Sequence, residues 1–290
     1  MWRVISVALA TALFCASASA KDPYPYWNGF YAGLNAGYSR SDNNSISTSA
    51  STTQLCSPNP PNPPGMCGFL PAAAEAAAAG ASGVWPVNTD GLSAGGQVGY
   101  NFQISNKLVA GIEADIQMMP GSDRASANTV TTGPFSNIST DLSVTKAIDY
   151  LGTLRGRLGY LVAPTVLVYG TGGFAYGGVR SSTSISQAYT PVVFNTIEPQ
   201  WSSFASDSET ITGWTAGAGT EWAVGSDISL KGEFLYYDLG TVTYNGGTLV
   251  DKCTAAAPFC SVYFANAVQT KFDNSGYIAH VGLNYHFGGG

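Results

Sequence analysis

The chain has 290 residues, of which 35 are glycine, 12% are aromatic and 10% are charged, whereas about a quarter of an ordinary soluble domain is charged. The many aromatic side chains exclude a disordered chain, and a formal net charge of −6 with scattered acidic residues argues against nucleic-acid binding. After the first 20 residues no apolar run is long enough for a membrane-spanning helix. An all-β protein with an apolar outer surface remains.

Residues 1–20 have the features of a secretory signal peptide: one basic residue (Arg3), an apolar stretch from Val4 to Ala16, and small residues at positions 18–20. We therefore expect cleavage near Ala20 and a mature domain formed by residues 21–290. Lipidation of Cys15 is the alternative, and it is disfavoured because a bulky phenylalanine precedes this cysteine.

Segments with strictly alternating side chains follow along the mature chain. The first places Phe30, Leu34 and Tyr38 on one face, and the fourth places Ile148 and Tyr150 together on the apolar face. Each segment has about ten residues or more, the length that a tilted strand needs to cross a bilayer. Eight such strands are predicted, near residues 30–41, 92–102, 108–119, 146–162, 166–180, 211–223, 228–239 and 277–287.

The connections between these strands alternate between short and long. The second and third, fourth and fifth, and sixth and seventh strands are joined by a few residues, while the other connections have roughly 25 to 50 residues. All long loops therefore lie at one end, as in outer-membrane barrels with periplasmic turns and extracellular loops. A secreted sandwich or lipocalin-like barrel would instead have an apolar interior. The sequence predicts an all-β, eight-stranded, antiparallel up-and-down transmembrane β-barrel.

Five spaced blocks carry a resemblance to a known family; they are Trp27–Tyr38, Gly111–Ile116, Gly152–Tyr160, Lys231–Gly240 and Gly282–Phe287. In these blocks the chain resembles the porin-like outer-membrane β-barrel surface antigens of alphaproteobacteria, which are small eight-stranded proteins. The resemblance covers the barrel and leaves out the long loops. It implies a location in the cell outer membrane of a Gram-negative bacterium.

The expected role is structural and surface-exposed, contributing to envelope integrity and surface interaction, because an eight-stranded barrel encloses little more than its own side chains. A narrow porin for small solutes is the alternative, and an adhesin or ligand-binding protein acting through its long loops is a second one. Expected partners are outer-membrane lipid, lipopolysaccharide and the barrel-insertion machinery, with host or phage contacts through the loops as a further option. The resemblance implies an insertion signal at Tyr285 and Phe287, here followed by Gly288–Gly290.

Strand parity also points a set of ionisable side chains into the lumen, all at a similar height above the periplasmic turns. They are Glu113, Asp115, Arg155, Arg157, Glu221, Lys231, Glu233 and His280. Because an unpaired charge at this depth would be costly, we expect opposite charges to pair and to form a plug.

Within this plug we expect Arg155 and Arg157 to lie against Glu113 and Asp115. Equal parity in the short hairpins lets Gly173 lie opposite Arg155, and Gly219 opposite Lys231, which gives the long side chains room. A packing role is the simpler interpretation, and a gate whose rearrangement opens a narrow channel is the sharper hypothesis.

No catalytic, cofactor or metal site is expected, and we do not expect the protein to be an enzyme. The glycine-rich run 170–175 matches a dinucleotide-binding pattern, but no helix follows it. His280 and His286 point into the lumen by parity and are interpreted as structural. The mature cysteines lack metal-ligand spacing, so disulfides are expected instead; they are Cys56, Cys67, Cys253 and Cys260.

Local pairing of these cysteines is predicted, Cys56 with Cys67 and Cys253 with Cys260, and a cross-link between the first and last long loops is the alternative. The first long loop also contains a proline run at 59–65 and an alanine run at 72–79. The alanine run has helix propensity but is too short to be stable alone. We expect a solvated surface loop here, with a recognition element for phage, host or lipopolysaccharide as the alternative.

Overall fold

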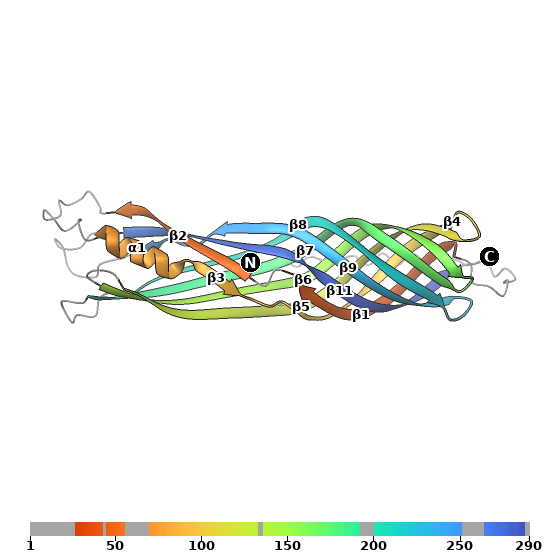
Figure 1. Ribbon diagram of the computed structural model, residues 1–290, viewed down its shortest axis with the longest axis horizontal. Coiled ribbons are helices and arrows are strands. Elements are labelled where there is room, and N and C mark those ends of the chain that lie inside the picture. The colour runs from red at the N-terminus through yellow and green to blue at the C-terminus, as the bar shows by residue number, and fades with distance from the viewer. Residues whose placement is uncertain are drawn as a thin grey trace, which may run out of the picture.

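The computed structural model describes residues 27–42, 45–55, 70–132, 136–191, 200–250 and 264–287. The described part is an elongated antiparallel β-structure with one helix, α1 (Leu70–Ala81), near the end opposite the short turns (Figure 1). The strands are β1 (Gly29–Ser41), β2 (Ser45–Leu55), β3 (Gly83–Pro86), β4 (Gly91–Gln103), β5 (Leu108–Thr132), β6 (Ser136–Ala163), β7 (Val166–Pro191), β8 (Gln200–Ala223), β9 (Ile228–Asn245), β10 (Leu249–Val250) and β11 (Phe264–Phe287).

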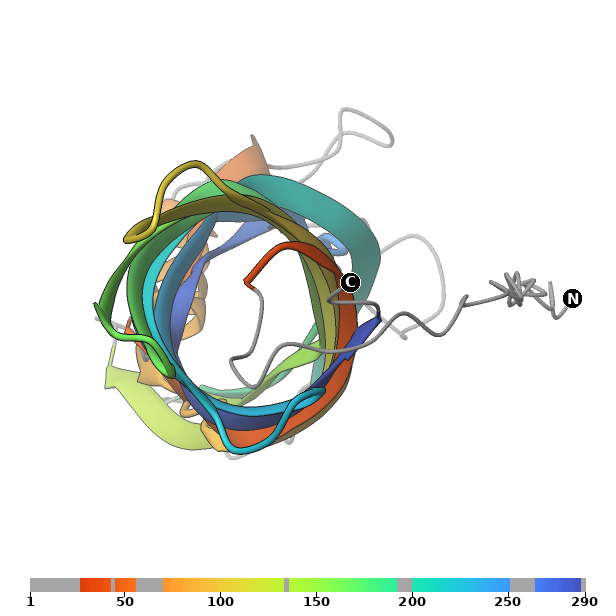
Figure 2. The ribbon, with the colours of Figure 1, turned by 90° about the vertical axis from the view of Figure 1, so that its right-hand side faces the viewer.

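Eight of these strands close into a ring in the order β1, β4, β5, β6, β7, β8, β9, β11, and β11 pairs back with β1 (Figure 2). The closing pair runs antiparallel from Phe30 opposite Phe287 to Ser41 opposite Gly276. Closure leaves the ring without an open edge, as a β-structure in hydrocarbon requires. Each of the eight predicted membrane-crossing segments lies in one of these strands.

The predicted count of eight is wrong for the sheet as a whole, which has eleven strands. Strands β2, β3 and β10 lie in segments expected to be loops; β2 and β10 pair with β11, and β3 pairs with β2. The predicted long strands are also too short on the side away from the short turns: β5 and β7 end later than predicted, β6 and β8 begin earlier, and the four have 25, 26, 28 and 24 residues. The segments expected to be loops are therefore largely continuations of the barrel wall. We call this part the extracellular storey, and we call the part between the short turns and the register shifts of β5 and β6 the membrane storey.

Irregular register marks the join between the two storeys. The β5–β6 register shifts between Met118 and Gly121, and the β6–β7 register shifts between Ile148 and Tyr150. A bulge in β6 moves the following side chains to the opposite face. Ile148, predicted to face outward with Tyr150, is therefore only 2% exposed and faces the interior.

The interiors of the two storeys differ in polarity. In the membrane storey most apolar side chains face outward and are exposed, with Leu34 at 73% and Val281 at 62%; a small buried cluster near the short turns, which includes Val109 and Leu167, is the exception. In the extracellular storey the apolar side chains face inward and form one buried cluster, which includes Val144, Val179 and Val268. The larger of the two buried apolar clusters therefore lies mainly in the extracellular storey.

Helix α1 closes this upper core, and the expectation that the alanine run 72–79 lies in a solvated loop is wrong. Ala74 and Ala77 are fully buried in the upper cluster. The side chain of Asn266 on β11 donates to the carbonyl of Ala74 at 3.1 Å, and that of Gln187 on β7 donates to the carbonyl of Ala77 at 2.7 Å. The short helix is thus stabilised by contacts with strands that lie far away in the sequence.

Several predictions fall outside the described residues: the signal peptide, the four cysteines, the proline run and the glycines that follow Phe287. Within the described ranges, no helix has both the length and the apolarity that a membrane span demands.

Candidate functional site in the barrel lumen

Eight ionisable side chains predicted to face the lumen all do so, and we call this set the charged belt. The cross-strand register places Glu113 on β5 opposite Arg155 on β6, and Glu233 on β9 opposite His280 on β11. Every member is at most 6% exposed; the members are Glu113, Asp115, Arg155, Arg157, Glu221, Lys231, Glu233 and His280.

Arg155 is the centre of the belt and holds three carboxylates. Its Nη2 donates to Glu113 Oε1 at 2.5 Å and to Asp115 Oδ2 at 2.8 Å, and its Nη1 lies 3.0 Å from Glu233 Oε2. Thr153, one inward position away on β6, accepts from Arg155 Nε at 2.9 Å and donates to Asp115. Asp115 is thereby fixed by two groups of β6.

Arg157 binds a different carboxylate, so the expected pairing of Arg157 with Glu113 and Asp115 needs correction. The shortest ion pair of Arg157 is with Glu221 on β8 at 2.6 Å, while Glu113 Oε2 lies 3.6 Å away and Asp115 forms no ion pair with Arg157. The guanidinium also stacks on the ring of Tyr169, 4.2 Å from its centroid. The position along β6 explains the difference. Arg157 is closer to the periplasmic turn than Arg155, and Glu221 is the carboxylate at the same height in the lumen.

Lys231 and His280 complete the belt. Lys231 Nζ donates to Glu113 Oε1 at 2.7 Å and lies 3.4 Å from Glu233 Oε2. His280 Nε2 lies 3.0 Å from Glu233 Oε2, and its Nδ1 is 3.2 Å from the side-chain amide of Gln117. Four carboxylates, three permanent cations and one imidazole therefore form one connected network across five strands.

Neutral side chains that were not among the predicted site residues extend this network. Tyr31 donates to Glu113 Oε2 at 2.6 Å and accepts from Arg157, while Tyr169 donates to Glu233 Oε1 at 2.9 Å. Asn284 donates to Glu221 Oε1 at 2.8 Å. All three share the inward parity of the charged residues, so the same alternation could have identified them.

Glycines leave room for these large side chains. Gly173 lies opposite Arg155, and Gly219 lies opposite Glu233, not opposite Lys231 as expected. A side chain at Gly219 would collide with Tyr169, because its Cβ would lie 2.5 Å from the Tyr169 hydroxyl. The turn between β8 and β9 shifts the register by two residues from the one we expected, so that Lys231 faces Glu221.

The histidines lack the geometry of a nucleophilic relay. His286 Nε2 lies 2.9 Å from Ser229 Oγ and 3.3 Å from Glu221 Oε1, so the hydroxyl and the carboxylate compete for the same ring nitrogen. A catalytic triad instead needs the acid on one ring nitrogen and the hydroxyl on the other. In the described ranges no group of three or more His, Cys, Asp or Glu side chains is placed to hold a metal ion.

A family model described as outer membrane protein beta-barrel domain matches residues 6–287. The 31 kDa outer-membrane immunogenic protein of Brucella melitensis is 37% identical over 161 residues, which cover 55% of this chain and 58% of that protein. The 22 kDa outer membrane protein of Rhizobium leguminosarum is 31% identical over 153 residues, 52% of this chain and 55% of that protein. The matched region thus spans little more than half of each relative.

Among solved structures, the outer membrane protein OprG from Pseudomonas aeruginosa covers 91% of this chain and is itself covered completely, with 12% identity and a TM-score of 0.42. The attachment invasion locus protein Ail of Yersinia pestis covers 87% of this chain, with 99% of its own length matched, 9% identity and a TM-score of 0.27.

Proposed function

Because the chain belongs to the outer membrane protein beta-barrel domain family, we propose that it serves the outer membrane as a closed structural barrel with a large extracellular surface, and neither as an open channel nor as an enzyme. Its location is the outer membrane of a Gram-negative bacterium, as for its relatives. The proposal concerns what the barrel does there.

The charged belt is the observation that carries this proposal. A conducting lumen needs a continuous hydrated path, whereas the belt fills the lumen with side chains that bind one another at 2.5–3.6 Å. Arg155, Lys231 and Glu221 are at most 1% exposed, so solvent scarcely reaches them. The apolar core of the extracellular storey then lies in series with the belt as a second barrier.

The extracellular storey supports a role in surface interaction. Its outward positions are mainly Ser, Thr, Asn and Asp, for example Ser126, Asn128 and Asp141, which help to line a shallow groove on the outer face of β5, β6 and β7. A polar wall of hydrogen-bonded strands presents a defined surface to the medium. Host or phage contacts would take place on this wall.

Enzymatic activity is not part of the proposal, because both histidines are held by carboxylates of the lumen. His280 faces Glu233, and the Ser229 hydroxyl near His286 donates to Glu221 at 2.6 Å, so it is not held as a free nucleophile.

For assembly, we infer that the barrel-insertion machinery reads the end of β11. Tyr285 and Phe287 face outward with 49% and 50% exposure, and their rings form an edge contact with centroids 5.0 Å apart. An outward aromatic pair at the periplasmic end of the closing strand is accessible before β1 and β11 join.

Planar-bilayer recording tests the closed state. We expect the purified full-length protein, with folding verified by heat-modifiable gel mobility, to show no steady conductance. A stable open channel in the wild-type protein would overturn the proposal in favour of a narrow porin.

A further inference from the structure

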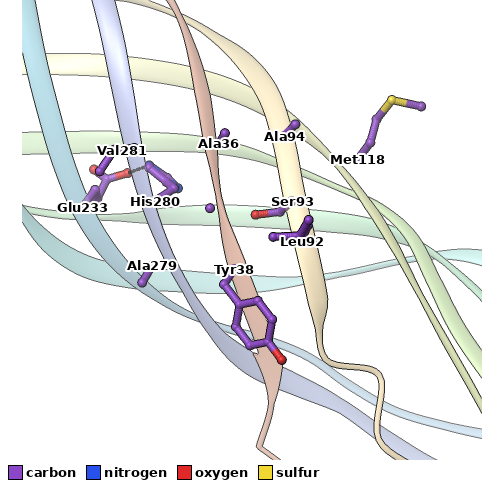
Figure 3. A pocket seen from close by; sticks show the side chains of 11 residues that line it. Ala36, Tyr38, Leu92, Ser93, Ala94, Met118, Glu233, Ala279, His280 and Val281 are labelled. Atoms are coloured by element: carbon purple, nitrogen blue, oxygen red, sulfur yellow. Dashed lines mark ion pairs between the residues drawn. The ribbon is translucent and has the colours of Figure 1, made fainter.

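A groove of about 830 Å³ lies against the barrel wall where β11, β1 and β4 run side by side (Figure 3). The register builds it from two rows of outward side chains. One row is Val281, Ala36, Ala94 and Met118, and the row above it is Ala279, Tyr38 and Leu92. Ala36 and Ala94 form the floor, because larger side chains flank them on three sides.

The lining of the groove is almost entirely apolar on the outer face of the barrel. Tyr38, Leu92, Met118 and Val281 are 50–73% exposed, which is the exposure expected of side chains that contact lipid. The other lining residues occupy inward positions of the wall behind the floor; they are Gly37, Ser93, Glu233 and His280.

The groove lies in the outer half of the membrane storey. On β1 the outward residues run from Phe30, level with the aromatic pair at the periplasmic end, to Tyr38. A tilted strand rises about 20 Å over these eight residues, close to the height of the apolar band of an outer-membrane barrel. The row of Tyr38 therefore lies near the outer interface, and the floor lies just beneath it.

An outward cation stands directly above this row. Arg40 follows Tyr38 on the same face of β1 and is exposed, opposite Tyr277 of β11. In the part of the chain that the structure describes, Arg40 forms no ion pair, whereas Arg180 pairs with Asp149 at 2.5 Å. Asp42 lies one outward position farther from the membrane. Arg40 is thus an available positive charge at the height of lipid headgroups.

We propose that this groove binds a phosphorylated glycolipid of the outer leaflet, with an acyl chain on Ala36 and Ala94 and a phosphate on Arg40. Guanidinium groups bind phosphate through two parallel hydrogen bonds, and a chain-sized apolar hollow beneath the cation fits the rest of such a lipid. The inference rests on the membrane location and is independent of whether the lumen conducts, so bilayer conductance does not affect it.

The test counts lipid bound to the full-length protein. Each variant is reconstituted in phosphatidylcholine nanodiscs with a small fraction of lipopolysaccharide, re-extracted in mild detergent, and examined by native mass spectrometry. We expect one lipopolysaccharide per wild-type barrel. Arg40→Gln should reduce its occupancy about tenfold, and Ala94→Leu, which fills the groove without touching the charge, should do the same.

Two controls separate this site from the ordinary lipid annulus. Arg180→Gln removes another outward cation, and Ala218→Leu enlarges a small outward residue of β8, away from the groove; both should retain wild-type occupancy. Dephosphorylated lipid A should bind the wild-type protein about as weakly as lipopolysaccharide binds the Arg40→Gln variant. Inorganic phosphate should not displace the lipid. Equal loss in all four variants, or unchanged occupancy in Arg40→Gln and Ala94→Leu with mobility proving that they fold, would overturn the proposal.

Discussion

Replacing Arg155 with alanine is the sharpest test of the charged belt. Arg155 holds Glu113, Asp115 and Glu233, and its own side chain is fully buried. The variant leaves Glu113 and Glu233 with Lys231, but it removes the only ion pair that Asp115 forms within the described residues. Breaking a buried pair from one side costs about 3–5 kcal/mol, and we expect the free energy of unfolding to fall by this amount.

The assay is a urea titration of the folded protein in lipid vesicles, followed by heat-modifiable gel mobility. The matched control is Arg180→Ala, which breaks the exposed ion pair with Asp149 and should cost about 1 kcal/mol or less. Adding Asp115→Asn to Arg155→Ala should recover part of the loss, because the stranded charge is then gone. If Arg155→Ala moves neither the unfolding midpoint beyond the Arg180→Ala control nor the conductance, the belt is solvated and the plug is refuted.

Three further predictions concern the extracellular storey. Lys146 lies above Tyr150 and the membrane storey and is 1% exposed, and burial lowers its pKa to about 8. Because the unfolded chain keeps this proton up to about pH 10.4, the free energy of unfolding should rise between pH 8 and 10.4. Lys146→Met should abolish that rise and add up to about 3 kcal/mol at pH 7, as measured by urea titration. Ala77→Asp puts a charge into the fully buried face of α1, so limited proteolysis should cut the extracellular storey while gel mobility shows an intact barrel. Mass spectrometry of unreduced peptides should show local disulfides and no cross-link between the two loops; the expected pairs are Cys56 with Cys67 and Cys253 with Cys260.

Alternation of side chains was sufficient to predict the membrane storey. Lipid on one side and a crowded lumen on the other impose a strict period of two, so residues as far apart as Glu113 and His280 were placed on the same face from parity alone. Parity fixes the face of a side chain but not its partner across the lumen. Parity alone therefore pairs Arg157 with Glu113 and Asp115, whereas its height on β6 places it beside Glu221.

The extracellular storey escaped prediction because its pattern is inverted. Outside the membrane the outward positions are mainly polar, so a search for strands with an apolar outer face ends at the interface. The bulge at Asp149 also changes the parity of β6, so strict alternation predicts the wrong face for Ile148. Local propensity favours a helix in the alanine run but does not show that α1 is stable, since its partners Gln187 and Asn266 are more than 100 residues away.

The two storeys follow one physical rule with opposite results. In the membrane storey the surroundings are apolar, so the polar side chains gather inside and must neutralise one another, as Arg155 and its three carboxylates do. In the extracellular storey the surroundings are water, so the apolar side chains gather inside, where Val144 and Ile148 belong to the same buried cluster as the alanines of the helix. The change takes place over a few residues, for Met118 is 72% exposed outward and Met119 is 2% exposed inward. A solute would have to cross both a charged network and a dry core, and rearranging the belt alone would leave the upper barrier in place. Opening this barrel therefore requires this apolar core, to which α1 contributes Ala74 and Ala77, to rearrange as well.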